Sequence, residues 1–489
     1  MEDRYIVSID FGTFRIAVAV ASVSGDDTKI VYYKETPVSG MRNSRILNES
    51  KVAQALKKAI EDAEDLLGIK INGAVVGMPR FYVSTEENSA AIDREPDSFI
   101  TPVEIEELKN FAQDNYPVED PDHDTVYGAI AQSFSTDDEF QVIEDDIVGM
   151  SGKRLEGNFK VFIGNRSSLD KIDKVMKAAG IVAMKKYFTP QLTADATLFA
   201  SETDNGVALI DFGGGCTSLS IYYKNILRHY SSIPFGGCNV TRDIQTESSI
   251  KASLAENIKL AYGACMPEKL QNLSEKQLLI KSENGDADKR LSVKYLSEII
   301  TAREEEIVNA MLYEIGKSGF ADKIQSGIVI TGGGAQMANL GNLITEMSGY
   351  GVRIGRPNFK GIYNCCTGLG SPSAATSVGL VKAAAELGAS CAFSRESIAE
   401  NAETADGVSQ KTEETAEPTD RERETGMIPG LMTPEEIERK KKHEDRKAAK
   451  KERNGKFSAF WKNANKMYRH VEERLGNTTD SILSMRDEQ

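Results

Sequence analysis

The sequence has little of what metal centres and disulfide frameworks need. It holds six cysteines and four histidines in 489 residues, and no two cysteines form a C-x-x-C pair. We therefore expect neither a zinc site nor a set of disulfide bonds, and a reducing cytosol is the simple interpretation.

Long apolar runs are also missing. No segment approaches the roughly 18 residues of a membrane-spanning helix. Residues 1–4 lead into a strand without the basic and apolar regions of a signal peptide, so none is expected. The formal net charge of −15 argues against non-specific nucleic-acid binding. The composition, 40% hydrophobic and 27% charged, is that of a globular protein with room for two to four domains.

The most informative stretch is an apolar strand, 206–210, that ends in Asp211 and is followed by the glycines 213–215. Glycines permit tight turns and leave backbone N–H groups open to phosphate oxygens. Asp211 would repel phosphate, so it is expected to hold Mg²⁺ through water, because Mg²⁺ sheds its waters reluctantly. The following pattern has period two, which predicts a β-hairpin rather than the strand-to-helix turn of a Rossmann or Walker loop.

A second copy of this pattern stands at the beginning of the chain. The strand 5–9 ends in Asp10, which is followed by Gly12, Thr13 and an apolar alternation. A single Asp-Phe-Gly turn is common, but Asp10 matches Asp211 in a copy about 200 residues away. The pair predicts a duplicated domain with two hairpins facing each other across a cleft.

Two further segments are candidates for nucleotide contacts. Glu256 and Lys259 are three residues apart and share a helix face. They could hold ribose hydroxyls, although a surface ion pair explains the same spacing. The strand 326–331 runs into the glycines 332–334 and an expected helix, 336–348. Bare glycine backbone at a helix N-terminus suits a phosphate or the edge of a nucleoside.

Between the two halves the character of the chain changes. Residues 80–158 have short polar strands, acidic clusters and a capped helix start at Thr101, which predict an inserted subdomain. The segment 159–164 is expected to resume the strand pattern of the first domain. Residues 192–201 predict one helix between the halves, and the core is expected to end at about Gly388.

The last hundred residues differ from the rest. Residues 389–454 have few large apolar side chains and predict a disordered, charged tether. Residues 455–476 predict an amphipathic helix flanked by lysine and arginine, which suits a bilayer interface, although its apolar face could instead dock on protein. The apolar-face residues expected to enter the membrane are Phe457, Phe460, Trp461, Met467, Tyr468, Val471 and Leu475.

These patterns resemble the superfamily of actin, sugar kinases and heat-shock chaperone ATPases. The likeness rests on the phosphate loops 9–13 and 210–217 and the adenosine loop 329–335. Within it, the chain resembles the bacterial cell-division family FtsA over about residues 4–386. The segments that carry this closer likeness are 149–156, 233–244, 255–263, 352–357 and 375–380.

The resemblance implies an α/β fold: a duplicated actin-like (ribonuclease-H-like) two-lobe fold with an inserted 1C-type subdomain and a disordered C-terminal tether ending in an amphipathic helix. The implied segments are the first lobe 1–79, 159–200 and 359–388; the insert 80–158; the second lobe 201–244 and 324–358; its small subdomain 245–323; the tether 389–454; the helix 455–476; and the tail 477–489.

It also implies ATP and Mg²⁺ between the lobes. Asp10 and Asp211 would hold Mg²⁺ through water, and with Gln191 they are the catalytic candidates. Since no water-activating base is identified, at most a slow Mg-dependent ATPase is expected. The residues assigned to the nucleotide are Gly12, Thr13, Phe14, Gly213, Gly214, Gly215, Cys216, Thr217, Glu256, Lys259, Gly332, Gly333, Gly334 and Ala335.

The function implied by the resemblance is in cell division. Such a protein anchors filaments of the tubulin-like FtsZ to the cytoplasmic face of the inner membrane at the division septum. It binds the FtsZ C-terminal tail through 245–323, self-associates into filaments, and recruits later division proteins, in part through 80–158. Nucleic acid is not an expected partner. The alternatives are a small-metabolite kinase, a pilus-assembly ATPase and a chaperone-like ATPase, although the tail cannot form the β-rich domain of a chaperone.

Overall fold

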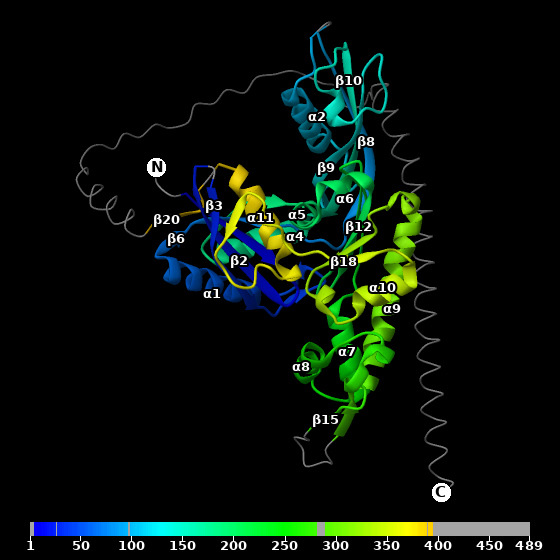
Figure 1. The fold of residues 1–489 in the computed structure, drawn as a ribbon. Coiled ribbons are helices and arrows are strands. Elements are labelled where there is room, and N and C mark those ends of the chain that lie inside the picture. The colour runs from blue at the N-terminus through cyan, green and yellow to red at the C-terminus, as the bar shows by residue number, and fades with distance from the viewer. Residues whose placement is uncertain (1–3, 26, 96–97, 281–288, 389, 395–489) are drawn as a thin grey trace, which may run out of the picture. The chain divides into compact units, whose positions relative to one another are not determined.

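The computed structural model describes residues 4–25, 27–95, 98–280, 289–388 and 390–394, which are coloured in Figure 1. The expected tether apart from 390–394, the expected amphipathic helix with its apolar face from Phe457 to Leu475, and the tail 477–489 lie outside the described residues. These three expectations stay predictions.

The first lobe is built on a sheet with helices on both faces (Figure 1). Because both faces are covered, its central strands read as continuous apolar runs. In spatial order the main strands are β11 (Val182–Tyr187), β7 (Gly73–Gly77), β1 (Arg4–Phe11), β2 (Arg15–Ser24), β3 (Asp27–Pro37) and β19 (Ile362–Asn364). The helices pack in pairs, α1 (Glu49–Leu67) with α4 (Arg166–Ala178), and α5 (Thr189–Thr197) with α11 (Ala375–Glu386).

The second lobe repeats this strand order. In both sheets an antiparallel three-strand meander is followed by two parallel strands, which confirms the expected duplication. Its strands are β14 (Ile226–Ile233), β13 (Thr217–Tyr223), β12 (Val207–Phe212), β17 (Ile328–Thr331) and β18 (Val352–Ile354). Its helices are α7 (Gly237–Ser248), α8 (Ala252–Tyr262), α9 (Val293–Lys317) and α10 (Leu340–Ser348). The short strands β15 (Gln277–Ile280) and β16 (Lys289–Ser292) pair antiparallel.

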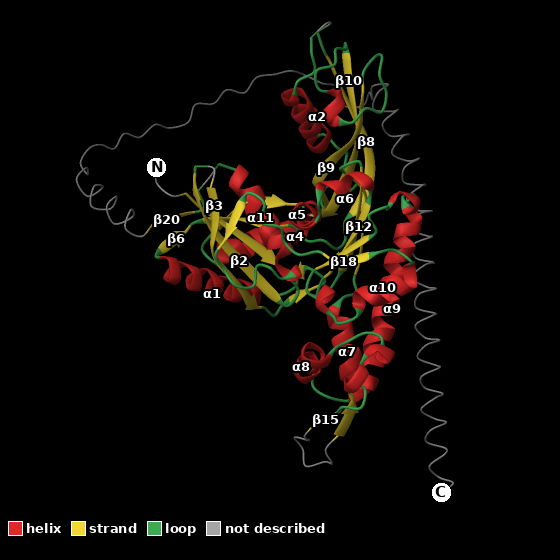
Figure 2. Cartoon of the chain, viewed as in Figure 1, coloured by secondary structure: helices red, strands yellow, loops and turns green. Residues whose placement is uncertain are grey.

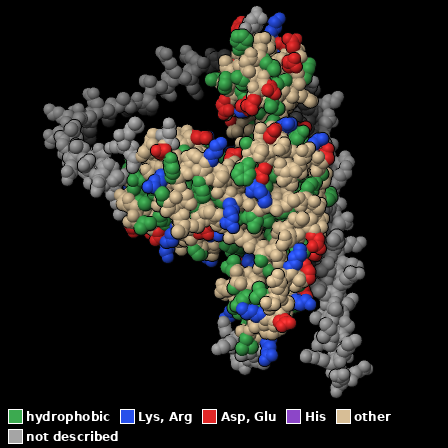
Figure 3. Space-filling view, viewed as in Figure 1, with side chains coloured by type: hydrophobic (Ala, Val, Ile, Leu, Met, Phe, Trp, Pro, Cys, Tyr) green, Lys and Arg blue, Asp and Glu red, His purple; other side chains and the backbone are tan. Residues whose placement is uncertain are grey.

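The insert is a three-stranded sheet with its own apolar core (Figure 2). Its elements are β8 (Ser84–Asp93), α2 (Pro102–Asp114), β9 (Asp124–Ser135), α3 (Glu144–Ile147) and β10 (Arg154–Asn165). Thr101 caps α2 through a capping box with Glu104, as its sequence position predicted. Acidic side chains stand out on the surface of this subdomain (Figure 3).

Two expectations about the insert are wrong. Its strands are long, and 159–164 does not return to the sheet of the first lobe. These residues belong to β10, whose partners among the described strands are β8 and β9. The apolar alternation of 159–164 indicates a strand with one buried face. Such a strand has the same sequence pattern in either sheet, so the pattern cannot decide which sheet it joins.

Three other element boundaries differ from expectation. The helix expected over 192–201 is two helices, α5 and α6 (Ala200–Asn205), because the backbone at Leu198 is extended. The helix expected from 336 begins only at Leu340, after a left-handed residue at Asn339. The core does not end at 388, since β20 (Ala392–Ser394) pairs with β1 and with β6 (Ile69–Ile71).

The remaining short strands, β4 (Met41–Arg42) and β5 (Arg45–Ile46), form a small hairpin. All six cysteines are free. Within the described ranges no group of three or more histidine, cysteine or acidic side chains could hold a metal ion. Among the described helices, none is both long and apolar enough to cross a bilayer.

Candidate functional site

The two aspartate hairpins have the same turn. The N–H of Gly12 donates to the carbonyl of Arg15 at 2.9 Å, and the N–H of Gly213 donates to the carbonyl of Cys216 at 3.0 Å. Each turn closes an antiparallel strand pair, β1–β2 in the first lobe and β12–β13 in the second. Matching turns at the ends of matching strands are what the duplicated sequence pattern predicted.

The tips of the two hairpins face each other at contact distance. A Cβ atom on Gly214 would lie 2.6 Å from the ring of Phe14, and one on Gly215 would lie 2.6 Å from Oγ1 of Thr13. Side chains at these two positions would push the lobes apart. Glycine therefore lets the side chains of Phe14 and Thr13 approach the backbone of the second hairpin.

The third glycine loop lies against the second hairpin. Gly332 has φ +86°, and a Cβ there would lie 2.3 Å from Oδ1 of Asp211 and 2.6 Å from the carbonyl of Phe212. A Cβ on Gly333 would lie 3.2 Å from Nη2 of Arg15, which belongs to the first hairpin. Because β12 pairs with β17, the strand ends that carry the second and third loops lie side by side.

Both aspartates lie beside arginines, and Asp211 is the more deeply buried of the two. Asp211 is 6% exposed and pairs with Nη1 of Arg80, while its Oδ1 has no hydrogen-bond partner. Burial raises the pKa of Asp10, and the charges of Arg80 and Arg15 oppose that rise. Arg15 in turn donates to Glu35 at 2.6 Å. The site therefore contains acidic groups gathered around arginine guanidinium groups.

Sequence reasoning missed Arg80. It lies three residues beyond the end of β7, the strand that lies parallel to β1 and beside its carboxyl end. Residues that follow neighbouring parallel strands meet at one edge of a sheet, so this position was a detectable signal. What the sequence did not show is that the side chain reaches Asp211 of the other lobe.

Glu256 and Lys259 form part of an internal network rather than a surface pair. Lys259 is 9% exposed and lies 2.7 Å from Glu256. Its Nζ donates to the carbonyl of Gly237 at 3.0 Å and to Oγ1 of Thr241 at 2.9 Å. The N–H of Gly237 donates to the carbonyl of Gly213, so the network is joined to the second hairpin.

The remaining predicted site residues divide into two kinds. Cys216, Thr217 and Ala335 are buried and support the loops from inside, and the hydroxyl of Thr217 donates to a carbonyl at 2.9 Å. Gln191 is exposed on α5. The start of that helix is close to the first hairpin, because a Cβ on Gly77 would lie 2.5 Å from Thr189 and 3.7 Å from Oδ1 of Asp10.

These residues fit a nucleotide with a divalent cation. Asp211 offers a buried carboxylate oxygen without a partner, which suits a cation or its bound water. The backbone at the second hairpin tip, where Gly214 and Gly215 carry no side chain, suits phosphate oxygens. The amides of Gly12 and Gly213 are used within the turns. The site thus combines acceptors for a cation with donors for an anion.

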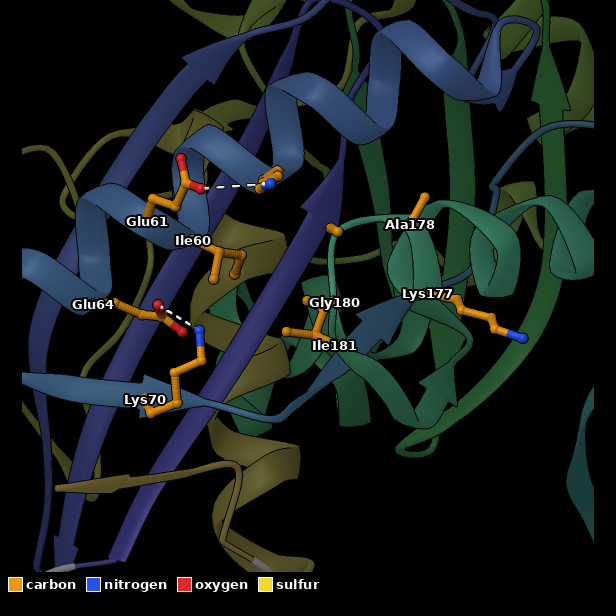
Figure 4. A pocket seen from close by; sticks show the side chains of 10 residues that line it. Ile60, Glu61, Glu64, Lys70, Lys177, Ala178, Gly180 and Ile181 are labelled. Carbon is orange, nitrogen blue, oxygen red and sulfur yellow. Dashed lines mark hydrogen bonds and ion pairs between the residues drawn. The ribbon is translucent and has the colours of Figure 1, made fainter. Parts of the chain in front are cut away.

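The cavity shown in Figure 4 lies elsewhere and is not this site. It has a volume of about 270 Å³ and is lined by α1, β6 and the end of α4. Two of its lysines are neutralised by Glu61 and Glu64, at 3.9 and 2.9 Å. The chemistry that could recognise a nucleotide is at the hairpin tips.

Two lobes with the same strand order, each presenting an aspartate–glycine hairpin to the other, define an actin-like ATPase fold. A solved structure agrees: the chain resembles one titled "PilM-PilN type IV pilus biogenesis complex" with a TM-score of 0.55 and 15% identity, covering 78% of this chain and 98% of that chain.

The sequence comparisons define the family. Residues 208–379 match the family described as "Cell division protein FtsA". The chain is 30% identical over 380 residues to the cell division protein FtsA of Pseudomonas aeruginosa, covering 77% of this chain and 88% of that protein. It is 29% identical over 390 residues to that of Neisseria meningitidis, covering 79% and 91%. The chain belongs to the FtsA family.

Proposed function

We propose that this chain is an ATP-binding division protein that ties FtsZ filaments to the cytoplasmic face of the inner membrane at the septum. The observation that carries the proposal is the meeting of two aspartate–glycine hairpins and a third glycine loop in a chain of this family. Membership in the FtsA family supports a role in cell division, and the site supports a conformational change that depends on bound nucleotide.

The nucleotide would be held from both lobes at once. Amides near Gly12 and Thr13 come from the first lobe, and amides near Gly214 and Gly215 come from the second. Asp10 and Asp211 would hold Mg²⁺, which when bound offsets phosphate charge. Because the two sets of donors lie on different lobes, the nucleotide state would bias lobe closure, and closure would bias self-association. Hydrolysis is expected to be slow, since Gln191 is exposed rather than held in place.

The nucleotide assignment is tested with a fluorescent ATP analogue. Asp211→Ala should abolish Mg-dependent binding, because it removes the buried carboxylate that faces the hairpin tips. The matched control is Asp243→Ala, which removes the partly buried partner of Arg303 on α7. Unchanged binding by Asp211→Ala would contradict the assignment, and loss of binding in both variants would indicate a general structural effect.

Protein partners would dock on surfaces away from the cleft. The small subdomain, 245–323, is where the FtsZ C-terminal tail would bind. The insert exposes large apolar side chains, which suits contacts with a second copy and with later division proteins. Those side chains are Phe99, Val103, Phe111 and Phe140, exposed by 70%, 65%, 50% and 74%.

A binding assay with the FtsZ tail peptide tests the first partner. Labelled peptide should bind the full chain and be displaced by unlabelled peptide. Arg290→Glu on exposed β16 should weaken binding, whereas Arg154→Glu on the exposed start of β10 should not. If the peptide does not bind, the pilus-assembly alternative is favoured. The fold likeness to a PilM-PilN complex is the reason for considering that alternative.

The membrane anchor rests on sequence, because 455–476 lies outside the described residues. An apolar face with Trp461 between basic side chains suits the interface of an anionic bilayer. Deleting 456–489 should release the protein from liposomes in a sedimentation assay, while deleting only 477–489 should leave it bound. Liposome binding that survives the longer deletion would refute the anchor.

A further inference from the structure

Arg80 bridges the two lobes at the centre of the site. It stands on the first lobe, between β7 and β8, and its guanidinium pairs with Asp211 at the end of β12. The side chain is 13% exposed, and Nη2 lies 3.7 Å from where a Cβ on Gly213 would stand. Arg80 therefore places a positive charge beside the second hairpin from the opposite lobe.

The backbone of Arg80 is held from the second lobe as well. The hydroxyl of Tyr230 on β14 donates to the carbonyl of Arg80 at 2.5 Å. Tyr230 is itself buried against the rings of Phe162 and Phe188, with centroids 6.1 and 5.3 Å away. Because both ends of Arg80 are restrained, its guanidinium is directed at Asp211 rather than free to sample solvent.

The charges around Arg80 are those of a cation site. The carboxylates of Asp10 and Asp211 both feel its charge. One oxygen of buried Asp211 accepts from the guanidinium, while the other has no partner. Enclosed carboxylates need a compensating positive charge. A divalent cation and a guanidinium satisfy the same need. A cation at Oδ1 of Asp211 would stand beside the guanidinium at Oδ2, and the two positive charges would repel each other.

We propose that Arg80 is a built-in counter-ion that competes with the divalent cation for Asp211, so that loading the site with cation and nucleotide releases a contact between the lobes. The proposal rests on the proposed function. In this proposal Arg80 acts through Asp211, and the Mg²⁺ concentration needed for nucleotide binding depends on its side chain.

The first test is a Mg²⁺ titration of binding to a fluorescent ATP analogue. Arg80→Gln removes the competitor and should lower the Mg²⁺ concentration at half-binding by about tenfold. Arg80→Lys keeps a cation and should lie between this variant and the unaltered protein. The control, Arg353→Gln, breaks a partly buried ion pair with Glu202 away from the hairpins and should not shift the midpoint. A midpoint that is unchanged or higher in Arg80→Gln would overturn the proposal.

The second test needs no nucleotide. Thermal unfolding is measured for Arg80→Gln, Asp211→Asn and the double variant. If the two groups compensate each other, the double variant is more stable than Arg80→Gln alone, because no bare carboxylate remains enclosed. Additive effects would overturn the proposal. Failure of the unaltered protein to bind nucleotide at saturating Mg²⁺ would instead reject the proposed function. The stability measurements on the three variants would still show whether Arg80 compensates the charge of Asp211.

Discussion

Replacing Gly332 by alanine tests the packing of the third glycine loop. At φ +86° an alanine pays the cost of a left-handed backbone, roughly 1–2 kcal/mol. A stiffer unfolded chain offsets about 0.4–1 kcal/mol of this. The new Cβ would also stand 2.3 Å from Oδ1 of Asp211 and 2.6 Å from a main-chain oxygen, which cannot rotate away. Such overpacking costs about 1–3 kcal/mol more.

Gly349 provides the matched control. It has φ +74°, ends α10 in the same lobe, and has nothing within 4 Å of an added Cβ. Gly349→Ala should therefore show only the net backbone cost, about 0–1.6 kcal/mol. The difference between the two variants isolates the contact with Asp211 and Phe212.

The assay is thermal unfolding followed by circular dichroism, together with binding of a fluorescent ATP analogue. Each kcal/mol corresponds to roughly 2–4 °C for a unit of 150–250 residues. Gly332→Ala should melt several degrees below Gly349→Ala and lose nucleotide affinity, whereas Gly349→Ala should keep it. Equal melting temperatures for the two variants would refute the idea that the third loop is closed onto Asp211.

Three further outcomes follow from buried polar groups. Tyr230→Phe leaves the carbonyl of Arg80 without its donor and should lower the free energy of unfolding by about 1–2 kcal/mol in a denaturant titration. The control, Tyr222→Phe, removes a buried hydroxyl that has no partner and should leave the free energy of unfolding unchanged. Burial raises the pKa of Glu304 from 4.5 to about 7, so the fold should lose stability as pH rises through that range and this carboxyl ionises. In thermal melts Glu304→Gln should therefore gain stability relative to the unaltered protein between pH 5 and 8. The exposed neighbour provides the control, and Glu305→Gln should show no such gain. Thr101→Ala removes the cap of α2 and should cost about 1 kcal/mol, seen as faster proteolysis within the insert and not within the lobes.

Local patterns in the sequence predicted most of the fold. The strand, aspartate and glycine order at Asp10 and Asp211 predicted both hairpins, because a period-two pattern and a glycine turn are properties of neighbouring residues. The third glycine loop was also placed correctly after β17.

The errors arose where a pattern has two possible partners. The residues of β10 alternate as a first-lobe strand would, and only the pairing with β8 and β9 decides which sheet they join. The short run that forms β20 carries no periodicity of its own and becomes a strand because β1 and β6 offer it an edge. The surroundings of Lys259 depend on α7, which spacing along α8 cannot reveal.

By itself the sequence determined the duplicated hairpins, the glycine loops and the family, since these depend on residue order over short distances. Only the tertiary structure decided that Arg80 of one lobe reaches Asp211 of the other, that one oxygen of Asp211 is left without a partner, and that the two glycine tips touch. These contacts join residues far apart in the chain. They depend on how the two lobes pack against each other, which no local sequence pattern encodes.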